Sequence, residues 1–212
     1  MSKTHTIITI GRQFGSGGRE IGKRLADELE IEFYDKELLS RAAKDSKICK
    51  ELFETHDEKP TNSFLYSLVM DTYSMGFASG SVNEMPLNHK IFLAQFDAIK
   101  KIAEEGPCVL VGRCADYALE ERDDVLSVFI HADMDKRIAA VMARDHINSR
   151  LKAKRKIEEI DEKRSTFRKE FTGEEWGQSK YYNLSIDTTH LSYQQAADLI
   201  LYYKKLAEEA QK

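Results

Sequence analysis

The stretch Thr6–Ala43, TIITIGRQFGSGGREIGKRLADELEIEFYDKELLSRAA, places an apolar run, a glycine-rich turn and an amphipathic segment in direct succession. The β-branched run Thr6–Ile10 predicts a buried strand. Ile21, Leu25 and Leu29 recur at helical spacing and give the following segment one apolar face. A strand, a glycine turn and a helix in this order are typical of a loop that holds a phosphate group.

Glycines dominate the turn and the start of the helix, at Gly11, Gly15, Gly17, Gly18 and Gly22. They let backbone N–H groups converge without obstruction, and the helix beginning near Gly17 adds its own N–H groups and dipole. Two other interpretations are a purely structural turn and a dinucleotide-binding turn. The dinucleotide form GxGxxG fails because Glu20 occupies its third glycine position. Phosphate binding is therefore the favoured interpretation, with Ser16 as the one hydroxyl in the turn for Mg²⁺.

The turn lacks the lysine of the phosphate-loop pattern GxxxxGK[ST], and two alignments stay open. If Gly17 is the last loop glycine, Gly18 stands in the place of the lysine. If Gly18 is the last, Arg19 replaces the lysine and Glu20 replaces the serine or threonine. An arginine carries the same charge and can bind two oxygens at once, so Arg19 or Arg12 could take the lysine's role.

The rest of the chain alternates predicted strands with predicted helices, which indicates an α/β fold with a parallel sheet flanked by helices. The further strands are expected at Ile31–Asp35, Cys108–Gly112, Val125–Ala132 and Asn183–Asp187. The further helices are expected at Ile91–Ala103, Met134–Arg144 and Ser192–Ala210, the second running on into the charge-dense Arg150–Lys169. Residues 49–86 lose this regularity and predict an irregular insert. Ligands of such sheets bind beyond the carboxyl ends of the strands.

Composition narrows the class of protein. The chain has 212 residues, enough for one domain, and a net charge of −4, which argues against a broad nucleic-acid or anionic-membrane surface. Three cysteines without paired spacing indicate a reduced, cytoplasmic protein. No signal peptide or membrane-spanning run is expected. The sequence leaves the oligomeric state open.

Four blocks together resemble the cytidylate kinase-like P-loop proteins, relatives of bacterial cytidylate kinase. They are ITIGRQFGSGGREIGKRLADELEIEFYDKELL, CVLVGRCADYAL, SVFIHADMDKRIAAVMARD and DEKRSTFRKEFTGEEWGQSKYYNLSIDTTHLS. The resemblance implies a nucleoside monophosphate kinase fold: one domain over residues 1–212, with a helical acceptor-binding insert at about 36–90 and an arginine-bearing lid at about 145–180. It also implies phosphoryl transfer from ATP, with Mg²⁺.

The pattern of the glycine turn and the resemblance together assign roles to individual residues. Arg19, Arg113, Arg164 and Arg168 are expected to act in catalysis, and Arg12, Gly15, Ser16, Gly17, Gly18, Arg19 and Glu20 to bind ATP, with Ser16 at the metal. Asp35, Arg113 and Asp116 are expected at the acceptor. Simpler interpretations compete, because most arginines on long helices are solvated and Asp35 would also suit the cap of a helix beginning at Lys36.

The acceptor predicted in this way is a nucleoside monophosphate, CMP or dCMP first. Two alternatives remain: a weakly active or inactive nucleotide-binding regulatory protein, and a kinase for a non-nucleotide metabolite. The missing lysine favours the regulatory protein, and the irregular insert, which would shape the acceptor pocket, leaves room for another acceptor.

Overall fold

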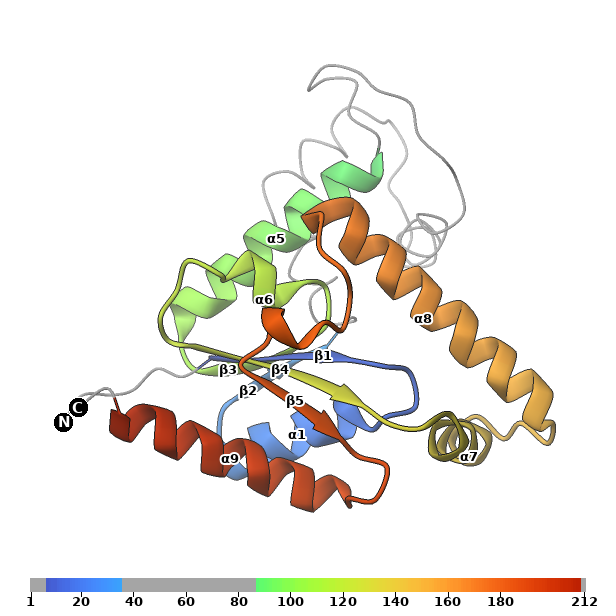
Figure 1. Cartoon of the computed structure of the whole chain (residues 1–212). Helices are drawn as coiled ribbons and strands as arrows, with labels where there is room; N and C mark the ends of the chain where they lie inside the picture. The colour runs from blue at the N-terminus through green and yellow to red at the C-terminus, as the bar shows by residue number, and fades with distance from the viewer. Residues whose placement is uncertain (1–6, 36–86, 211–212) are drawn as a thin grey trace. The chain divides into compact units, whose positions relative to one another are not determined.

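The structure, a computed structural model, describes residues 7–35 and 87–210 (Figure 1). The chain divides into two units, Met1–Asp35 with Glu105–Lys212, and Lys36–Glu104. Of the second unit the structure describes helix α5 (Leu87–Glu105), which contains the helix predicted at Ile91–Ala103. The irregular segment 49–86, the helix expected from Lys36 and nearly all of the predicted insert lie outside the described residues.

The first unit is built on a parallel sheet with strand order β2-β3-β1-β4-β5, which confirms the predicted fold class. Its strands are β1 (Ile7–Arg12), β2 (Glu32–Tyr34), β3 (Cys108–Val111), β4 (Val125–His131) and β5 (Leu184–Asp187). β1 is central, with Thr9 in register with Leu110 on β3 and Ser127 on β4. Because all strands are parallel, their carboxyl ends meet at one edge, where β1 continues into the glycine turn.

Helices α1 (Gly18–Leu29) and α9 (Tyr193–Ala210) lie side by side on one face of the sheet, and the short helix α6 (Ala115–Ala118) lies on the other (Figure 1). A reciprocal cap starts α9: Ser192 Oγ accepts from Gln195 N at 3.2 Å, and Gln195 Oε1 accepts from Ser192 N at 2.9 Å. A short 3₁₀ turn, η2 (Ser179–Tyr181), precedes β5.

The predicted continuous helix from Met134 through the charged stretch is wrong. The structure has two helices, α7 (Met134–Arg144) and α8 (Arg150–Thr172). Between them His146 adopts a left-handed φ of 54°, which ends the helical path, and the Ser149 hydroxyl accepts from Lys152 N to begin α8. The turn allows α8 to pack back against α7 through Ile138, Val141, Ala153 and Ile157.

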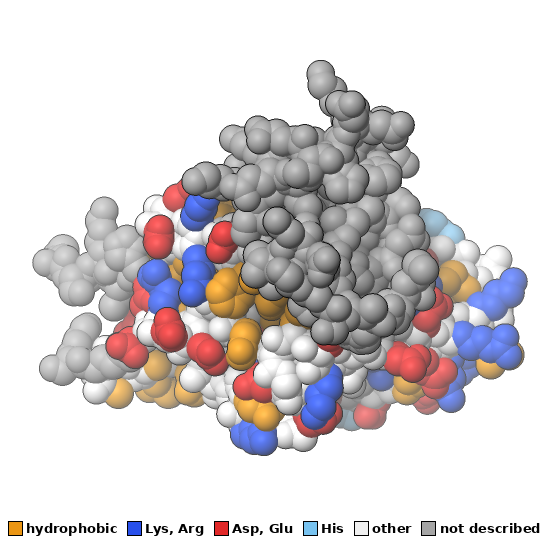
Figure 2. Space-filling model, turned by 90° about the horizontal axis from the view of Figure 1, so that it is seen from above, with side chains coloured by type: hydrophobic (Ala, Val, Ile, Leu, Met, Phe, Trp, Pro, Cys, Tyr) orange, Lys and Arg blue, Asp and Glu red, His pale blue; other side chains and the backbone are white. Residues whose placement is uncertain are grey.

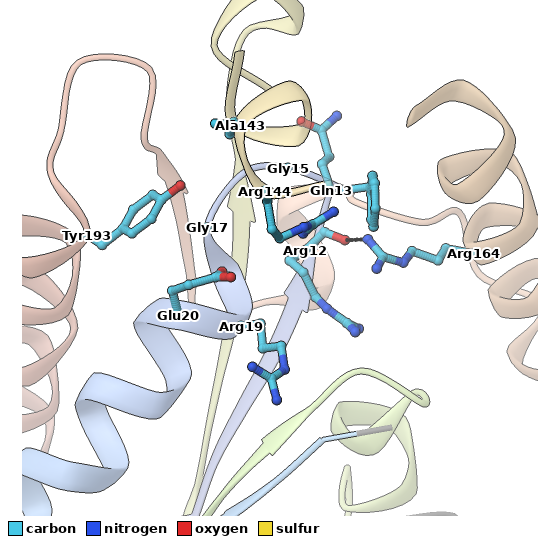
Figure 3. A pocket seen from close by; sticks show the side chains of 13 residues that line it. Arg12, Gln13, Gly15, Gly17, Arg19, Glu20, Ala143, Arg144, Arg164 and Tyr193 are labelled. Carbon is cyan, nitrogen blue, oxygen red and sulfur yellow. Dashed lines mark hydrogen bonds between the residues drawn. The ribbon is translucent and has the colours of Figure 1, made fainter. Parts of the chain in front are cut away.

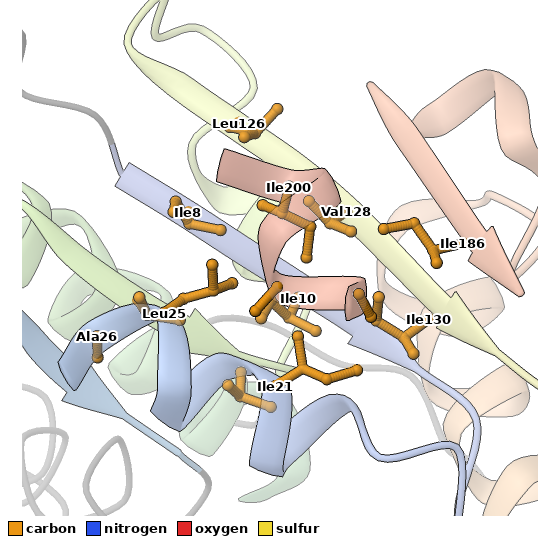
Figure 4. Close-up of a cluster of buried hydrophobic side chains, with 14 residues drawn as sticks. Ile8, Ile10, Ile21, Leu25, Ala26, Leu126, Val128, Ile130, Ile186 and Ile200 are labelled. Atoms are coloured by element: carbon orange, nitrogen blue, oxygen red, sulfur yellow. The ribbon is translucent and has the colours of Figure 1, made fainter. Parts of the chain in front are cut away.

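The main core lies between the sheet and the α1–α9 layer (Figure 4). β1 buries Ile8 and Ile10 in this core, and Ile7 and Thr9, which alternate with them, are also buried. A central parallel strand is thus covered on both faces. The predicted apolar face of α1 enters this core through Ile21 and Leu25, while Leu29 packs at its edge. These contacts fix the direction in which α1 leaves the carboxyl end of β1.

Figure 2 shows acidic and basic side chains interspersed across the part of one face that the described residues form. Within residues 7–35 and 87–210, no helix combines the length and apolarity needed to span a membrane.

Candidate phosphate-binding site

The turn between β1 and α1 requires glycine at two positions. Gly15 and Gly17 both have left-handed φ angles, 84° and 88°. A Cβ on Gly15 would lie 2.9 Å from the carbonyl oxygen of Arg137, and one on Gly17 would lie 2.1 Å from the Tyr193 ring. No side chain caps the first turn of α1, so its N–H groups remain available to an anion.

A pocket of about 510 Å³ opens over this turn (Figure 3). Its floor is the turn itself, and Tyr193 of α9 and the carboxyl end of α7 form walls. The charged side chains that line it are Arg12, Arg19, Arg144, Arg164 and a single carboxylate, Glu20. Four guanidinium groups around a helix N-terminus make this pocket attractive to a polyphosphate.

The helix geometry bears on the two alignments of the missing lysine. Gly17 is the N-cap and Gly18 the first residue of α1, so both candidate positions of the missing lysine, Gly18 and Arg19, lie in the first turn of this helix. Arg19 lines the pocket, but its guanidinium pairs with Asp35: Nε and Nη2 lie 2.9 and 2.7 Å from Oδ2. The guanidinium carbon of Arg19 also lies 5.9 Å from the centre of the Phe33 ring. The predicted ATP-binding Arg19 and acceptor-binding Asp35 therefore contact each other.

The predicted metal ligand Ser16 is 1% exposed and does not line the pocket. Its hydroxyl lies 2.9 Å from the carbonyl oxygen of Gln13 and 3.1 Å from that of Ile130, so it points into the fold. Glu20 is the carboxylate that faces the pocket. Among the described residues no group of three or more metal-ligating side chains gathers. Glu20 is therefore the side-chain oxygen donor that this pocket offers to a cation, and a cation here would need further ligands from a bound molecule or water.

The tip of the turn, Phe14, is fixed by α8, a contact that the sequence analysis missed. Asp161 of α8 accepts the Phe14 N–H at 2.7 Å and pairs with Arg137 Nη1 at 2.5 Å. Arg137 and Asp161 side chains are only 7% and 15% exposed. Burial raises the pKa of Asp161, while the Phe14 N–H and the guanidinium groups of Arg164 and Arg137 oppose that rise.

Two arginines hold the ring of Phe14 as well. Arg144, the last residue of α7, places its guanidinium carbon 4.6 Å from the ring centre, and Arg164 of α8 lies 5.5 Å from it. Arg164 Nη1 also donates to the carbonyl oxygen of Arg12 at 2.9 Å (Figure 3). The predicted lid residue Arg164 thus stands at the pocket, together with Arg144.

Arg168 and Asp116, two further predicted residues, lie outside the lining of the pocket and pair with each other. Arg168 is 3% exposed, and its guanidinium pairs with Asp116 at 2.5 Å and with Glu174 at 2.6 Å. Burial is the largest single influence and lowers the pKa of the Arg168 guanidinium, but Asp116, Tyr182 and Cys114 together outweigh it, so that the pKa is raised. Neither Arg168 nor Asp116 lines the pocket. In this arrangement their ion pair joins α8 to α6.

Arg113 lies in an unusual turn after β3. Gly112, Arg113 and Cys114 have consecutive left-handed φ angles of 83°, 58° and 53°, a conformation that costs free energy at the two non-glycine residues. One terminal nitrogen of Arg113, Nη2, is buried and has no hydrogen-bond partner in the structure of the described residues. Phe167 of α8 lies 5.8 Å from the guanidinium carbon. A strained turn that aims an unsatisfied guanidinium nitrogen is consistent with an anion-binding role.

A parallel α/β sheet whose central strand passes through a glycine turn into a helix, with arginines around the turn, defines a protein of the P-loop kinase fold. Residues 7–190 match the family described as "Cytidylate kinase-like family", and the chain belongs to that family.

Solved structures support the fold. An uncharacterized protein from Eubacterium ventriosum ATCC 27560 is 28% identical, with a TM-score of 0.71 over 93% of this chain and 97% of that one. A shikimate kinase from Bacteroides thetaiotaomicron is 13% identical, with a TM-score of 0.53 over 96% and 98% of the two chains. A gluconokinase from Sinorhizobium meliloti 1021 is 12% identical, with a TM-score of 0.53 over 98% and 97%. At this identity the two kinases show a shared fold alone. No functionally curated protein matches the chain.

Proposed function

We propose that this protein transfers the γ-phosphoryl group of ATP to a small acceptor, with CMP or dCMP as the first candidates. The observation that carries the proposal is the pocket at the start of α1, where uncapped helix N–H groups and four arginines converge. Family membership supports the same chemistry. Phosphoryl transfer depends mainly on positioning and charge neutralisation, which this set of groups can supply.

In this proposal the backbone of Gly15, Ser16, Gly17 and Gly18 cradles the ATP phosphates, with Arg12 or Arg19 as the cation that replaces lysine. An acceptor oxygen attacks the γ-phosphorus, the bond to the β–γ bridging oxygen breaks, and ADP leaves. Arg164, at the pocket, neutralises charge on the transferring group. When bound with the nucleotide, Mg²⁺ would neutralise phosphate charge, with Glu20 as its protein ligand. Ser16 would serve only if its hydroxyl left the two carbonyls it now contacts.

The acceptor side is proposed for Arg113 and Asp35. Arg113 has the buried, unsatisfied nitrogen that an acceptor phosphate or hydroxyl could bind. Asp35, the last residue of the described segment 7–35, pairs with Arg19. In this proposal the pair would order the side of the β1–α1 turn that faces the acceptor. In this account Asp116 and Arg168 do not contact the acceptor. Their ion pair ties α8 to the residues that follow the Gly112–Cys114 turn and so holds that turn in place. The insert at about 36–90 is proposed to complete the acceptor pocket, and residues 145–180 to form the lid.

One observation favours an alternative, a nucleotide-binding regulatory protein with weak or no turnover. The lysine is absent, and Arg19, a candidate replacement, is paired with Asp35. A kinase for a metabolite other than a nucleotide is the third possibility, since shikimate kinase and gluconokinase structures share the fold.

A coupled ADP-release assay separates these proposals. The acceptor panel is CMP, dCMP, UMP, AMP, shikimate and gluconate, each with Mg²⁺ and ATP. Acceptor-dependent turnover with CMP or dCMP supports the nucleotide kinase, and turnover with another acceptor redirects the substrate assignment. MgATP binding without turnover on any acceptor supports the regulatory protein. Arg164→Met should reduce turnover by about 100-fold or more if Arg164 neutralises the transferring group.

A further inference from the structure

We infer that the outer face of helix α9 is an interface between two copies of this chain, which pair their α9 helices antiparallel about a two-fold axis beside Tyr202. The residues of this face are Asp198, Leu199, Tyr202, Lys205 and Leu206, and none of them lines the pocket over the glycine turn. The inference is therefore independent of the proposed function.

An apolar row runs along the exposed side of α9, which with α1 forms the outer layer on one face of the sheet (Figure 1). Leu199 and Leu206 are 46% exposed, and Tyr202 is 62% exposed. Spacings of three and four residues align them on one side of the helix, like the a and d positions of a coiled coil. Among residues 7–35 and 87–210, these three belong to the five large hydrophobic side chains that are exposed. Single exposed hydrophobic residues are common, but a continuous row marks an interaction surface.

Two opposite charges flank the apolar row on the same side. Asp198 and Lys205 each stand one residue before a leucine of the row, and both are exposed. They are about 10 Å apart along the helix, which is too far for them to pair within one chain. Within the chain Asp198 accepts from Gln194 Nε2 at 3.0 Å, and Lys205 Nζ lies 4.0 Å from Glu209 Oε1. Exposed contacts of this kind contribute little, so a partner helix can compete for both charges.

An antiparallel pair of these helices matches row with row and charge with charge. In a two-fold dimer each contact occurs twice, because both copies use the same surface patch. An axis beside Tyr202 brings Leu199 against the partner's Leu206. On the flank it brings Asp198 against the partner's Lys205, which gives two symmetric ion pairs. The apolar row is thereby covered, and the charges beside it are self-complementary.

Other occupants fit this face less well. A parallel pair of helices would set the charged flank against the side of the partner helix that carries Ala196 and Tyr203, which packs in the core of its own chain. An anionic membrane would meet three carboxylates and two lysines on α9, a net negative charge. A second copy in antiparallel orientation is therefore the occupant that the charges specify.

Sedimentation velocity of the full chain, at about 5 to about 500 µM, tests the inference. We expect a reversible dimer with a dissociation constant on the order of 10 µM, since one helix row covers less area than a standard interface. Leu206→Glu places a charge within the apolar row and should raise that constant by about 30-fold or more. Leu151→Glu is the matched control: Leu151 is 59% exposed on α8, and its replacement should change the constant by less than about 2-fold.

Charge reversal tests the antiparallel arrangement. Asp198→Lys and Lys205→Asp, made singly, each set like charges against each other twice and should weaken self-association by about 10-fold or more. The double variant D198K/K205D restores both ion pairs and should return to within about 3-fold of wild type. An equimolar mixture of the two single variants should form heterodimers more tightly than either variant pairs with itself, because all four charges then find opposite partners.

The results that would overturn the inference are distinct. A wild-type chain that stays monomeric at about 500 µM would show that something other than a second copy covers the apolar row. Equal dimerisation of L206E and wild type, or equal weakening by L151E, would remove the interface from α9. A double variant no tighter than the single ones would overturn the antiparallel arrangement. Should L206E fail to fold by circular dichroism, the charge variants, whose side chains are exposed, still decide whether α9 forms the interface.

Discussion

Replacing Asp161 by asparagine should both loosen the turn between β1 and α1 and destabilise the protein. Asp161→Asn keeps an oxygen that can accept the Phe14 N–H, but it removes the charge that faces Arg137 at 2.5 Å. Arg137 would then keep a buried positive charge, since its side chain is only 7% exposed. Arg164, 3.7 Å from Asp161, would lose the same partner.

The magnitude follows from burial. Breaking a buried ion pair by removing one partner costs about 3–5 kcal/mol, and the low exposure of both side chains leaves little room for solvent screening. Burial also raises the pKa of Asp161, which means that ionising this carboxyl is itself costly in the fold. The neutral asparagine recovers part of that cost, so we expect a loss of about 3 kcal/mol. In a protein of this size that corresponds to a melting temperature lower by about 6–12 °C.

The assay is urea unfolding and differential scanning calorimetry at pH 7, with AMP-PNP titration on the same samples. Glu159→Gln is the matched control, because Glu159 lies on α8 in an exposed pair with Lys163 and should leave stability unchanged. D161N should also raise the dissociation constant for AMP-PNP. A D161N protein as stable as wild type to within about 1 kcal/mol would refute the claim that the buried pair fixes the turn.

Two further predictions concern titratable groups. A hydrogen bond from Arg144 holds the pKa of Asp145 at about 2, so this carboxylate stabilises the fold above its ordinary pKa of 3.8 and loses that effect as pH falls toward 2. Because the Arg144 side chain is 45% exposed, Asp145→Asn should lower the free energy of unfolding at pH 6 by no more than about 1 kcal/mol, measured by urea unfolding. The difference from wild type should shrink at pH 3, and a difference that stays constant with pH would contradict this prediction. Burial raises the pKa of Cys108 and Cys114 to about 12. With the third cysteine removed by Cys49→Ser, the native protein should therefore show no thiol that reacts with DTNB at pH 8 until urea exposes both cysteines. Rapid labelling of the native protein would contradict their burial.

Local patterns predicted the sheet and its helices well. Apolar runs flanked by polar residues or glycine gave β3, β4 and β5 to within a residue. Helical spacing gave the start of α7 at Met134, but the predicted helix continued past Arg144, where α7 ends. The glycine turn was recognisable because strand, turn and helix are adjacent in the chain. Each of these features depends on neighbours a few residues apart, which is the range that periodicity and capping describe.

Contacts between distant residues could not be predicted in the same way. The hydrogen bond from Phe14 to Asp161 joins residues 147 positions apart, and charge density alone made Asp161 look like one solvated carboxylate among many. Arg168 likewise read as a lid arginine, while the structure pairs it with Asp116. Ser16 turns its hydroxyl inward because the carbonyl of Ile130, on another strand, is within reach. All three depend on how elements far apart in the chain pack together: α8 on the turn, α8 on α6, and β4 beside the turn. No local pattern encodes such packing.

The central claim is that the turn between β1 and α1 binds the phosphates of a nucleoside triphosphate. Titration calorimetry of MgATP into the wild-type protein, repeated with inorganic tripolyphosphate as competitor, tests it most directly. We predict saturable binding at one site that tripolyphosphate displaces. Absence of any heat of association at millimolar MgATP, or binding that tripolyphosphate leaves untouched, would contradict the assignment of this turn as a phosphate site.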